Sequence, residues 1–215
     1  MQTYPVGLID LAGHRTLVIG GGNIALRKVK GLLDAGACVI LISPSIIPEL
    51  EDLSSTQEVL WEQRPYQNGD LSNAFLVIAA TNNPQVNQEI WEEAQREGCL
   101  LNVVDDPVHC NFILPAQVRH GDFSIAISTG GASPALARRL RERLETQFGP
   151  EYGDLTALLG ELRPTILGSF PPGDARLNAT FQLIDSDLIE VLIRDGYEQA
   201  RRYALGIIKP DADNE

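Results

Sequence analysis

Three consecutive glycines, Gly20, Gly21 and Gly22, follow a short β-rich run over residues 15–19. Good helix formers occupy residues 23–35 directly after them, and Gly36 stands where a glycine commonly ends a helix. The continuous apolar run over residues 38–42 is typical of a buried parallel strand. Strand, glycine turn, helix and strand within about 30 residues predict one βαβ unit.

The glycine turn fits the pattern G-x-G-x-x-G/A, with Ala25 at its last position. Gly20 permits the tight turn, Gly22 lets the backbone approach a pyrophosphate, and Ala25 lets the helix pack close to the sheet. The helix N-terminus favours the negative charge of that pyrophosphate. The turn therefore predicts a Rossmann-type domain that binds a dinucleotide, with a purely structural glycine turn as the alternative. The residues expected to contact the cofactor are Gly20, Gly22, Asn23, Ile24, Ser43, Pro44, Ser45, Thr81 and Asn82.

The end of the second strand bears on which nicotinamide dinucleotide binds. The acidic residue that usually follows this strand, and binds the ribose hydroxyls, is replaced by Ser43-Pro44-Ser45. No arginine stands there to hold a 2′-phosphate. The sequence therefore favours NAD over NADP without excluding NADP.

The alternation of strands and helices continues. Strands are expected at residues 59–61, 74–80 and 100–104, and a helix over residues 84–97 that begins at Pro84 and stops at Gly98. Such alternation is typical of a doubly wound parallel sheet, so the fold class is α/β.

The pattern changes after Asp105. Residues 111–114 and 123–128 are predicted as strands, and Ser133 and Pro134 as the cap and first residue of a helix with Leu136, Leu140 and Leu144 as its apolar stripe. From about residue 151 the chain is predicted to be helical. The expected domains are a Rossmann domain over 1–113, a small α+β dimerisation segment over 114–149 and a helical C-terminal domain over 150–215.

Asp105 is the candidate catalytic residue. Ligands bind beyond the carboxyl ends of the strands in open α/β sheets, and Asp105 follows the fifth strand at that edge. A carboxylate beside a hydride acceptor can take the proton as the hydride leaves. The alternative interpretation is that Asp105 caps a turn before Pro107. Asp105, His109 and Cys110 match no standard spacing of metal ligands, so no metal is expected.

Charge and cysteine content limit the partners and the compartment. The formal net charge of −12 disfavours nucleic acid and anionic membranes, and no apolar run approaches the roughly 20 residues of a membrane span. Three cysteines without a CxxC pair and the lack of a signal-peptide pattern favour a reducing cytoplasm. Arginine and lysine gather at residues 27–30 and 138–143, either as exposed helix faces or as contacts for an anionic ligand.

Five segments together resemble the precorrin-2 dehydrogenases, the N-terminal family of sirohaem synthases. The order and spacing agree over roughly residues 5–147, a far more specific signal than the glycine turn alone. The segments are residues 18–28 (VIGGGNIALRK), 79–83 (AATNN), 102–107 (NVVDDP), 111–116 (NFILPA) and 127–137 (ISTGGASPALA).

The resemblance implies NAD-dependent dehydrogenation of precorrin-2 to sirohydrochlorin in sirohaem biosynthesis, by a homodimer joined through residues 114–147. It implies that Asp105 is the key catalytic residue and that another protein carries out methylation. Because precorrin-2 is a tetrapyrrole with many carboxylates, the predicted substrate contacts are Ser128, Gly130, Gly131, Ser133 and Arg138. Plain helix capping is the alternative for the segment around Ser133, and exposure to solvent the alternative for Arg27 and Lys28.

Three other functions remain as alternatives. Some members of the family also insert ferrous iron into sirohydrochlorin, and the same carboxylate would serve both reactions. A regulatory module that senses NAD without turnover would need a DNA- or channel-contacting surface, and no helix-turn-helix spacing is visible. A protein that only holds the tetrapyrrole for delivery would bind NAD without producing NADH.

Overall fold

The computed structural model describes residue 4 and residues 6–208. Residues 1–3, residue 5 and residues 209–215, which the expected first and last domains include, lie outside the described residues. The chain divides into two compact units, one up to Leu114 and one from Pro115 onward. The separate domain expected from residue 150 stays a prediction.

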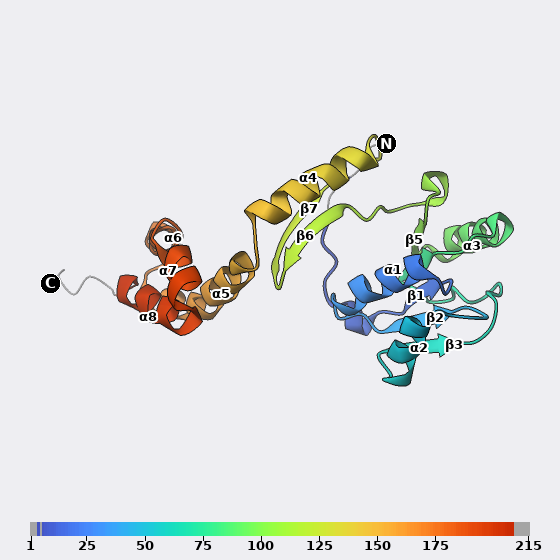
Figure 1. Ribbon diagram of the computed structural model, residues 1–215, viewed down its shortest axis with the longest axis horizontal. Helices are drawn as coiled ribbons and strands as arrows, with labels where there is room; N and C mark the ends of the chain where they lie inside the picture. Colours follow the sequence, from blue (N-terminus) through green and yellow to red (C-terminus); the bar gives the residue numbers. More distant parts are fainter. Residues whose placement is uncertain (1–3, 5, 209–215) are drawn as a thin grey trace. The chain divides into compact units, whose positions relative to one another are not determined.

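The first unit is built around a five-stranded parallel sheet (Figure 1). Its elements are β1 (Thr16–Ile19), α1 (Asn23–Leu33), β2 (Val39–Ile42), α2 (Pro48–Ser55), β3 (Val59–Glu62), β4 (Leu76–Ala79), α3 (Pro84–Glu97) and β5 (Leu100–Val103), with short 3-10 helices at Leu11–Gly13 and Pro107–His109. The five strands predicted up to residue 104 and the two predicted helices are present, with bounds that differ from the prediction by no more than two residues, and α2 is an element that the sequence analysis did not predict.

The strand order β3-β2-β1-β4-β5 reverses its direction of growth between β1 and β4. Thr16 to Ile19 of β1 pair with Val39 to Ile42 on one side and with Leu76 to Ala79 on the other. Such a reversal is the switch point at which open α/β sheets bind ligands beyond the carboxyl ends of their strands. The predicted α/β Rossmann-type fold is confirmed.

Both faces of the sheet are buried, which explains why its strands are apolar without alternation. On one face Ala25 and Val29 of α1 and Leu50 of α2 pack with strand residues such as Val18 and Leu41. On the other face Ile90 and Ala94 of α3 pack with strand residues such as Leu17 and Val77.

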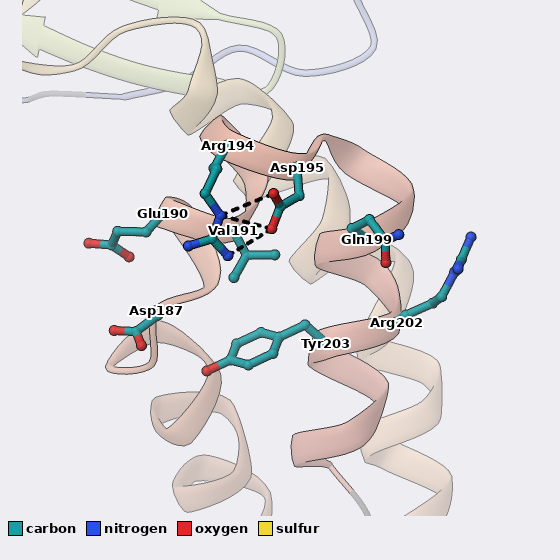
Figure 2. Close-up of a pocket in the computed structure, with 8 residues that line it drawn as sticks. All are labelled: Asp187, Glu190, Val191, Arg194, Asp195, Gln199, Arg202 and Tyr203. Atoms are coloured by element: carbon teal, nitrogen blue, oxygen red, sulfur yellow. Dashed lines mark hydrogen bonds and ion pairs between the residues drawn. The ribbon is translucent and has the colours of Figure 1, made fainter.

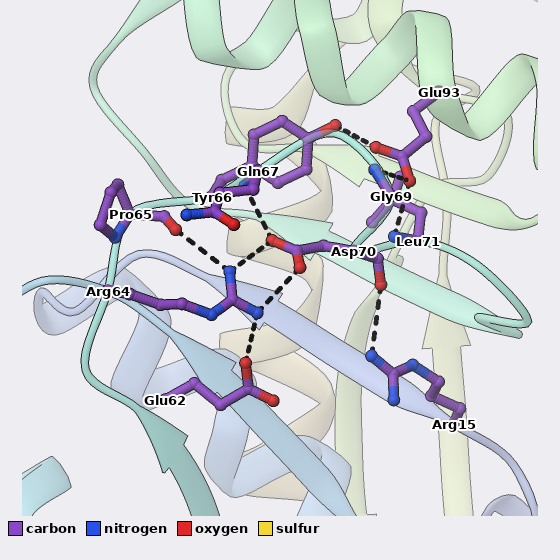
Figure 3. Close-up of polar contacts among 10 residues, drawn as sticks. All are labelled: Arg15, Glu62, Arg64, Pro65, Tyr66, Gln67, Gly69, Asp70, Leu71 and Glu93. Atoms are coloured by element: carbon purple, nitrogen blue, oxygen red, sulfur yellow. Dashed lines mark hydrogen bonds and ion pairs between the residues drawn. The ribbon is translucent and has the colours of Figure 1, made fainter.

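The connection from β3 to β4 forms no helix, and buried polar contacts hold it instead (Figure 3). Leu71 is fully buried in the same cluster as Ile90. The Glu93 carboxylate, 2% exposed, accepts hydrogen bonds from the amides of Gly69 (3.0 Å) and Leu71 (2.8 Å) and from the Tyr66 hydroxyl. Burial and this hydrogen bond raise the pKa of Tyr66 well above its usual value.

The Asp70 carboxylate also accepts hydrogen bonds that hold the connection between β3 and β4. Arg64 donates two hydrogen bonds of 2.8 Å to it, and the Gln67 amide donates another. Burial acts to raise the pKa of Asp70, but the hydrogen bonds from Arg64 and Gln67 outweigh burial and lower the pKa below its usual value. Figure 3 also shows Arg15 donating to the Asp70 carbonyl, which connects this segment to the start of β1.

The strand predicted at residues 111–114 is wrong, because those residues adopt no strand. Asn111 bonds to the edge of β5 with its side chain as well as its backbone. Its Oδ1 accepts from the Leu101 amide (2.7 Å), its Nδ2 donates to the Cys99 carbonyl (2.8 Å), and its own amide donates to the Leu101 carbonyl (3.0 Å). Asn111 thus bonds to β5 partly through its side chain, and residues 111–114 form no regular backbone ladder with that strand. The next strand begins after Pro115.

The second unit begins with an antiparallel hairpin of β6 (Ala116–His120) and β7 (Phe123–Ile127), followed by α4 (Pro134–Gln147). Ser133 caps α4 and Pro134 is its first residue, as predicted. The helices α5 (Glu151–Ser169), α6 (Asp174–Ile184), α7 (Leu188–Asp195) and α8 (Tyr197–Ile207) confirm a helical C-terminal region. Residues such as Leu158, Leu183 and Leu192 form its core. None of the described helices is both long and apolar enough to cross a membrane.

Candidate functional site

The glycine turn after β1 is packed too closely for side chains at its first two positions. Gly20 has φ +123°, and a Cβ on it would lie 2.3 Å from the Ala80 carbonyl oxygen after β4. A Cβ on Gly21 would lie 2.1 Å from the Ser45 carbonyl oxygen. The absence of a side chain at Gly20 therefore lets the turn pack against the loop after β4. Its absence at Gly21 lets the turn pack against the loop after β2. The motif pattern assigns no role to Gly21, although a third consecutive glycine is a signal of close packing.

Gly22, by contrast, faces open space. It is the N-cap of α1 with φ −97°, and a Cβ there would meet nothing within 4 Å. No side chain caps the helix, and its first turn carries no acidic residue. Asn23 is exposed, Ile24 is 36% exposed, and Ala25 is fully buried. The amide groups at this helix start are thus accessible to an anion, and Gly22 leaves room for it.

The loop after β2 lies against the glycine turn. The Ile47 amide donates to the Gly21 carbonyl at 3.0 Å. Ser43 is buried, and its hydroxyl donates to the Ser45 carbonyl at 2.7 Å, while Trp61 Nε1 donates to the Ser43 carbonyl at 2.9 Å. Ser45 and Pro44 are exposed. The Ser43 hydroxyl therefore shapes the loop, and the exposed part of the predicted ribose contact is Pro44 and Ser45.

The loop after β4 is ordered by side chains at the start of α3. The Thr81 hydroxyl donates to Asn87 Oδ1 at 2.8 Å, and Asn83 Oδ1 accepts from the Gln85 amide at 3.0 Å. Asn82 is exposed between them. The structure thus brings the loops after β1, β2 and β4 together at one edge of the sheet, as the predicted cofactor site requires.

Asp105 follows β5 at the same edge. Its side chain is exposed, its φ is +59°, and it makes no hydrogen bond or ion pair within the described part of the chain. The capping position before Pro107–His109 belongs to Asp106, whose Oδ2 lies 2.6 Å from His109 Nδ1. Asp105 thus lies in the turn before Pro107 without a capping hydrogen bond among the described residues, and its exposed side chain is at the carboxyl edge of the sheet.

The Cys110 side chain hydrogen-bonds to the backbone and is not directed to a ligand. Its Sγ accepts from the Val103 amide at 3.2 Å, and burial raises the pKa of the thiol. Among the residues that the structure describes, no three His, Cys, Asp or Glu side chains gather as a metal site.

The predicted substrate contacts lie in the second unit, four of them in the segment between β7 and α4 and Arg138 within α4. Gly130 and Gly131 have φ +59° and +83°, and the Ser128 hydroxyl accepts from the Gly130 amide at 3.2 Å. The Ser133 hydroxyl accepts from the Leu136 amide at 3.2 Å, so this side chain caps the helix. The Arg138 side chain is 79% exposed and pairs with Glu142 at 3.0 Å.

A groove of about 700 Å³ between α7 and α8 contains none of the predicted site residues (Figure 2). Its charged lining is mixed, and Arg194 is already bonded to both carboxylate oxygens of Asp195. The residues that line it are Asp187, Glu190, Val191, Arg194, Asp195, Gln199, Arg202 and Tyr203.

Comparisons with known proteins find relatives that match most of the chain. Residues 8–116 match a family described as "Putative NAD(P)-binding", and residues 121–147 match "Sirohaem biosynthesis protein central". A solved structure titled "SirC, precorrin-2 dehydrogenase" is 30% identical, with a TM-score of 0.71, over 95% of this chain and 98% of that chain.

The curated relatives are longer proteins. A siroheme synthase of Methylobacillus flagellatus is 36% identical over 95% of this chain and 44% of its own length. A siroheme synthase of Zymomonas mobilis is 39% identical over 75% of this chain and 34% of its own length. The chain thus spans less than half the length of these relatives.

Proposed function

Because this chain belongs to the precorrin-2 dehydrogenase family, we propose that it oxidises precorrin-2 to sirohydrochlorin with NAD as the hydride acceptor. The observation that carries the proposal is the match to SirC over nearly the full length of both chains. The exposed carboxylate of Asp105 at the carboxyl edge of the sheet, which has no hydrogen-bond or ion-pair partner among the described residues, supports it independently.

The cofactor is proposed to lie across the loops after β1, β2 and β4. The open space at Gly22 and the uncapped start of α1 suit a pyrophosphate, with Gly20, Asn23 and Ile24 beside it. Ser43, Pro44 and Ser45 would border the adenosine ribose, and Thr81 and Asn82 the other half of the dinucleotide. The bound nicotinamide supplies the hydride acceptor. The lack of an arginine among residues 43–45 supports NAD over NADP.

Asp105 is proposed to be the proton acceptor. Dehydrogenation removes one hydride and one proton from the substrate, and the carboxylate takes the proton. Ser128, Gly130, Gly131, Ser133 and Arg138 are proposed to bind carboxylate side chains of the tetrapyrrole. The two left-handed glycines before α4 and the exposed Arg138 within that helix support this assignment.

We expect Gly22→Asp to raise the Kd for NAD by about 100-fold or more, because its carboxylate would occupy the place of the pyrophosphate and repel it. The fold should tolerate the change, since a Cβ at Gly22 meets nothing and aspartate is a favourable N-cap residue. Titration calorimetry with NAD measures the effect, and Gly22→Ala separates bulk from charge. An unchanged Kd in Gly22→Asp would remove the glycine turn from the cofactor site.

A homodimer joined through residues 114–149 is part of the proposal. The hairpin of β6 and β7 has only two strands, and the apolar stripe of α4 is incompletely covered, with Leu136 51% exposed and Leu140 and Leu144 half-buried. A second copy of the segment would cover both features.

We expect Leu136→Glu to weaken this dimer by at least about tenfold in Kd, because a charge would be buried in the interface. Ala135→Glu is the matched control, since Ala135 is exposed on another side of the same helix. Sedimentation velocity across a concentration series measures both. If Leu136→Glu associates as the unaltered protein does, the interface lies elsewhere.

A cytoplasmic location is proposed from the three cysteines, which are all free. The net charge of −12 supports a small-molecule substrate rather than nucleic acid or a membrane surface.

The proposed function is tested by absorbance at the NADH band. The protein is mixed with NAD and enzymatically generated precorrin-2 under anaerobic conditions. NADH formation together with the sirohydrochlorin spectrum is the expected result. A folded protein that binds NAD but yields no NADH would overturn the reaction and leave cofactor binding without turnover.

A further inference from the structure

Lys28 differs from the other cations of α1 in its burial. Arg27 and Lys30 are exposed, whereas Lys28 is half-buried. Side chains of an α-helix tilt toward its N-terminus, so the long stem of Lys28 runs back toward the carboxyl edge of the sheet. Its ammonium group is therefore directed to the edge that carries the glycine turn.

The segment after β5 packs beside α1. Val104 and Phe112, on either side of Asp105, belong to the same hydrophobic cluster as Ala25 and Val29 of the helix. Lys28 consequently lies close enough to Asp105 and Cys110 for their charges to act on it.

Lys28 nevertheless has no direct partner among the described residues. No hydrogen bond or ion pair within 4.0 Å joins its ammonium group to Asp105 or to any other described carboxylate. Burial lowers the pKa of Lys28, Arg27 lowers it further, and Asp105 and Cys110 act in the opposite direction. An anion bound at this edge would give the half-buried ammonium group a charge-assisted hydrogen bond.

We propose that Lys28 binds a carboxylate side chain of the substrate and thereby places the reacting ring carbon beside Asp105. The assignment rests on the proposed function, which supplies a substrate with several carboxylates. Lys28 and Asp105 then have separate tasks on one edge: the cation binds the periphery of the tetrapyrrole, and the carboxylate accepts the proton. Holding the ring through its periphery leaves the Asp105 carboxylate free for the reacting carbon.

The test compares Lys28→Met with Lys30→Met, a change of the same type at an exposed position of the same helix. For Lys28→Met we expect KM for precorrin-2 to rise about tenfold or more, since one charge-assisted hydrogen bond is lost. The Kd for NAD should stay within about twofold of the unaltered protein, because the pyrophosphate is assigned to the helix start. Lys28→Arg should recover part of the loss, and Lys30→Met should change neither quantity.

A second measurement does not depend on turnover. Sirohydrochlorin, the proposed product, has the same carboxylate periphery, and its Kd without NAD is measured by quenching of the fluorescence of Trp61 and Trp91. Lys28→Met should weaken this binding by a similar factor. Unchanged KM and unchanged sirohydrochlorin Kd would overturn the inference, as would a rise in the NAD Kd with no change for the tetrapyrrole. The unaltered protein could bind sirohydrochlorin and yet produce no NADH, and the proposed oxidation of precorrin-2 would then be wrong. The role of Lys28 would still be decided by comparing the sirohydrochlorin Kd of Lys28→Met with that of the unaltered protein.

Discussion

Asp105→Asn is expected to lower kcat for precorrin-2 oxidation by about 10³-fold, because a general base contributes roughly 10²- to 10⁴-fold and an amide cannot accept the proton. Asparagine is a better test than alanine here. Asp105 has φ +59°, a left-handed conformation that Asn and Asp tolerate and other side chains adopt at a cost. The substitution thus removes the charge while it keeps the backbone in place.

The neighbouring acid provides the control. Asp106→Asn makes the same chemical change one residue away, where the carboxylate is already engaged by His109. We expect this variant to keep kcat within about threefold, since it alters the turn and not the proton acceptor. Single-turnover formation of NADH, with the Kd for NAD measured in parallel, gives the comparison. Turnover close to that of the unaltered protein in Asp105→Asn would exclude Asp105 as the base.

Local signals in the sequence predicted the elements that position the site. The run from Gly20 to Ala25 fixes the strand, turn and helix, and Gly98 ends α3 with φ +71°. Ser133 and Pro134 begin α4 as predicted. In each case the signal and the structure it specifies lie within a few residues, so sequence order is sufficient to detect it.

Contacts between distant residues could not be predicted in this way. Residues 111–114 have the apolar character of a strand, yet Asn111 bonds to the edge of β5 through its side chain, and no sequence period carries that information. The separate roles of Asp105 and Asp106 depend on backbone conformation, which two identical neighbours do not reveal. The burial of Lys28 depends on packing between α1 and the segment after β5.

The same limit applies to the connection between β3 and β4, where stability depends on a buried carboxylate that is distant in sequence. Glu93→Ala is expected to lower the free energy of unfolding by about 3–5 kcal/mol. The change leaves the amides of Gly69 and Leu71 and the Tyr66 hydroxyl without their acceptor. It also leaves a cavity beside Leu71, which is fully buried.

Two further variants separate these causes. Glu93→Gln keeps an oxygen for the two amides and can donate to the Tyr66 oxygen, so a smaller loss of about 1 kcal/mol is expected. Glu92→Ala, at an exposed position whose carboxylate accepts a hydrogen bond from Gln88, should change stability by no more than about 0.5 kcal/mol. Urea unfolding of the three variants measures the series. An equal loss in Glu93→Ala and Glu92→Ala would mean that the buried acceptor does not set the effect, since alanine is the better helix former at both positions.

The Kd for NAD distinguishes an effect of Glu93 on stability alone from an effect that also reaches the cofactor site. None of the predicted cofactor contacts bonds to Glu93, Tyr66 or Leu71, because those contacts lie in the loops after β1, β2 and β4. At a temperature where Glu93→Ala is still folded, its Kd for NAD should therefore equal that of the unaltered protein. If the Kd rises in the folded variant, the connection between β3 and β4 also orders the carboxyl edge of the sheet. The polar network of Figure 3 would then act on the site as well as on stability.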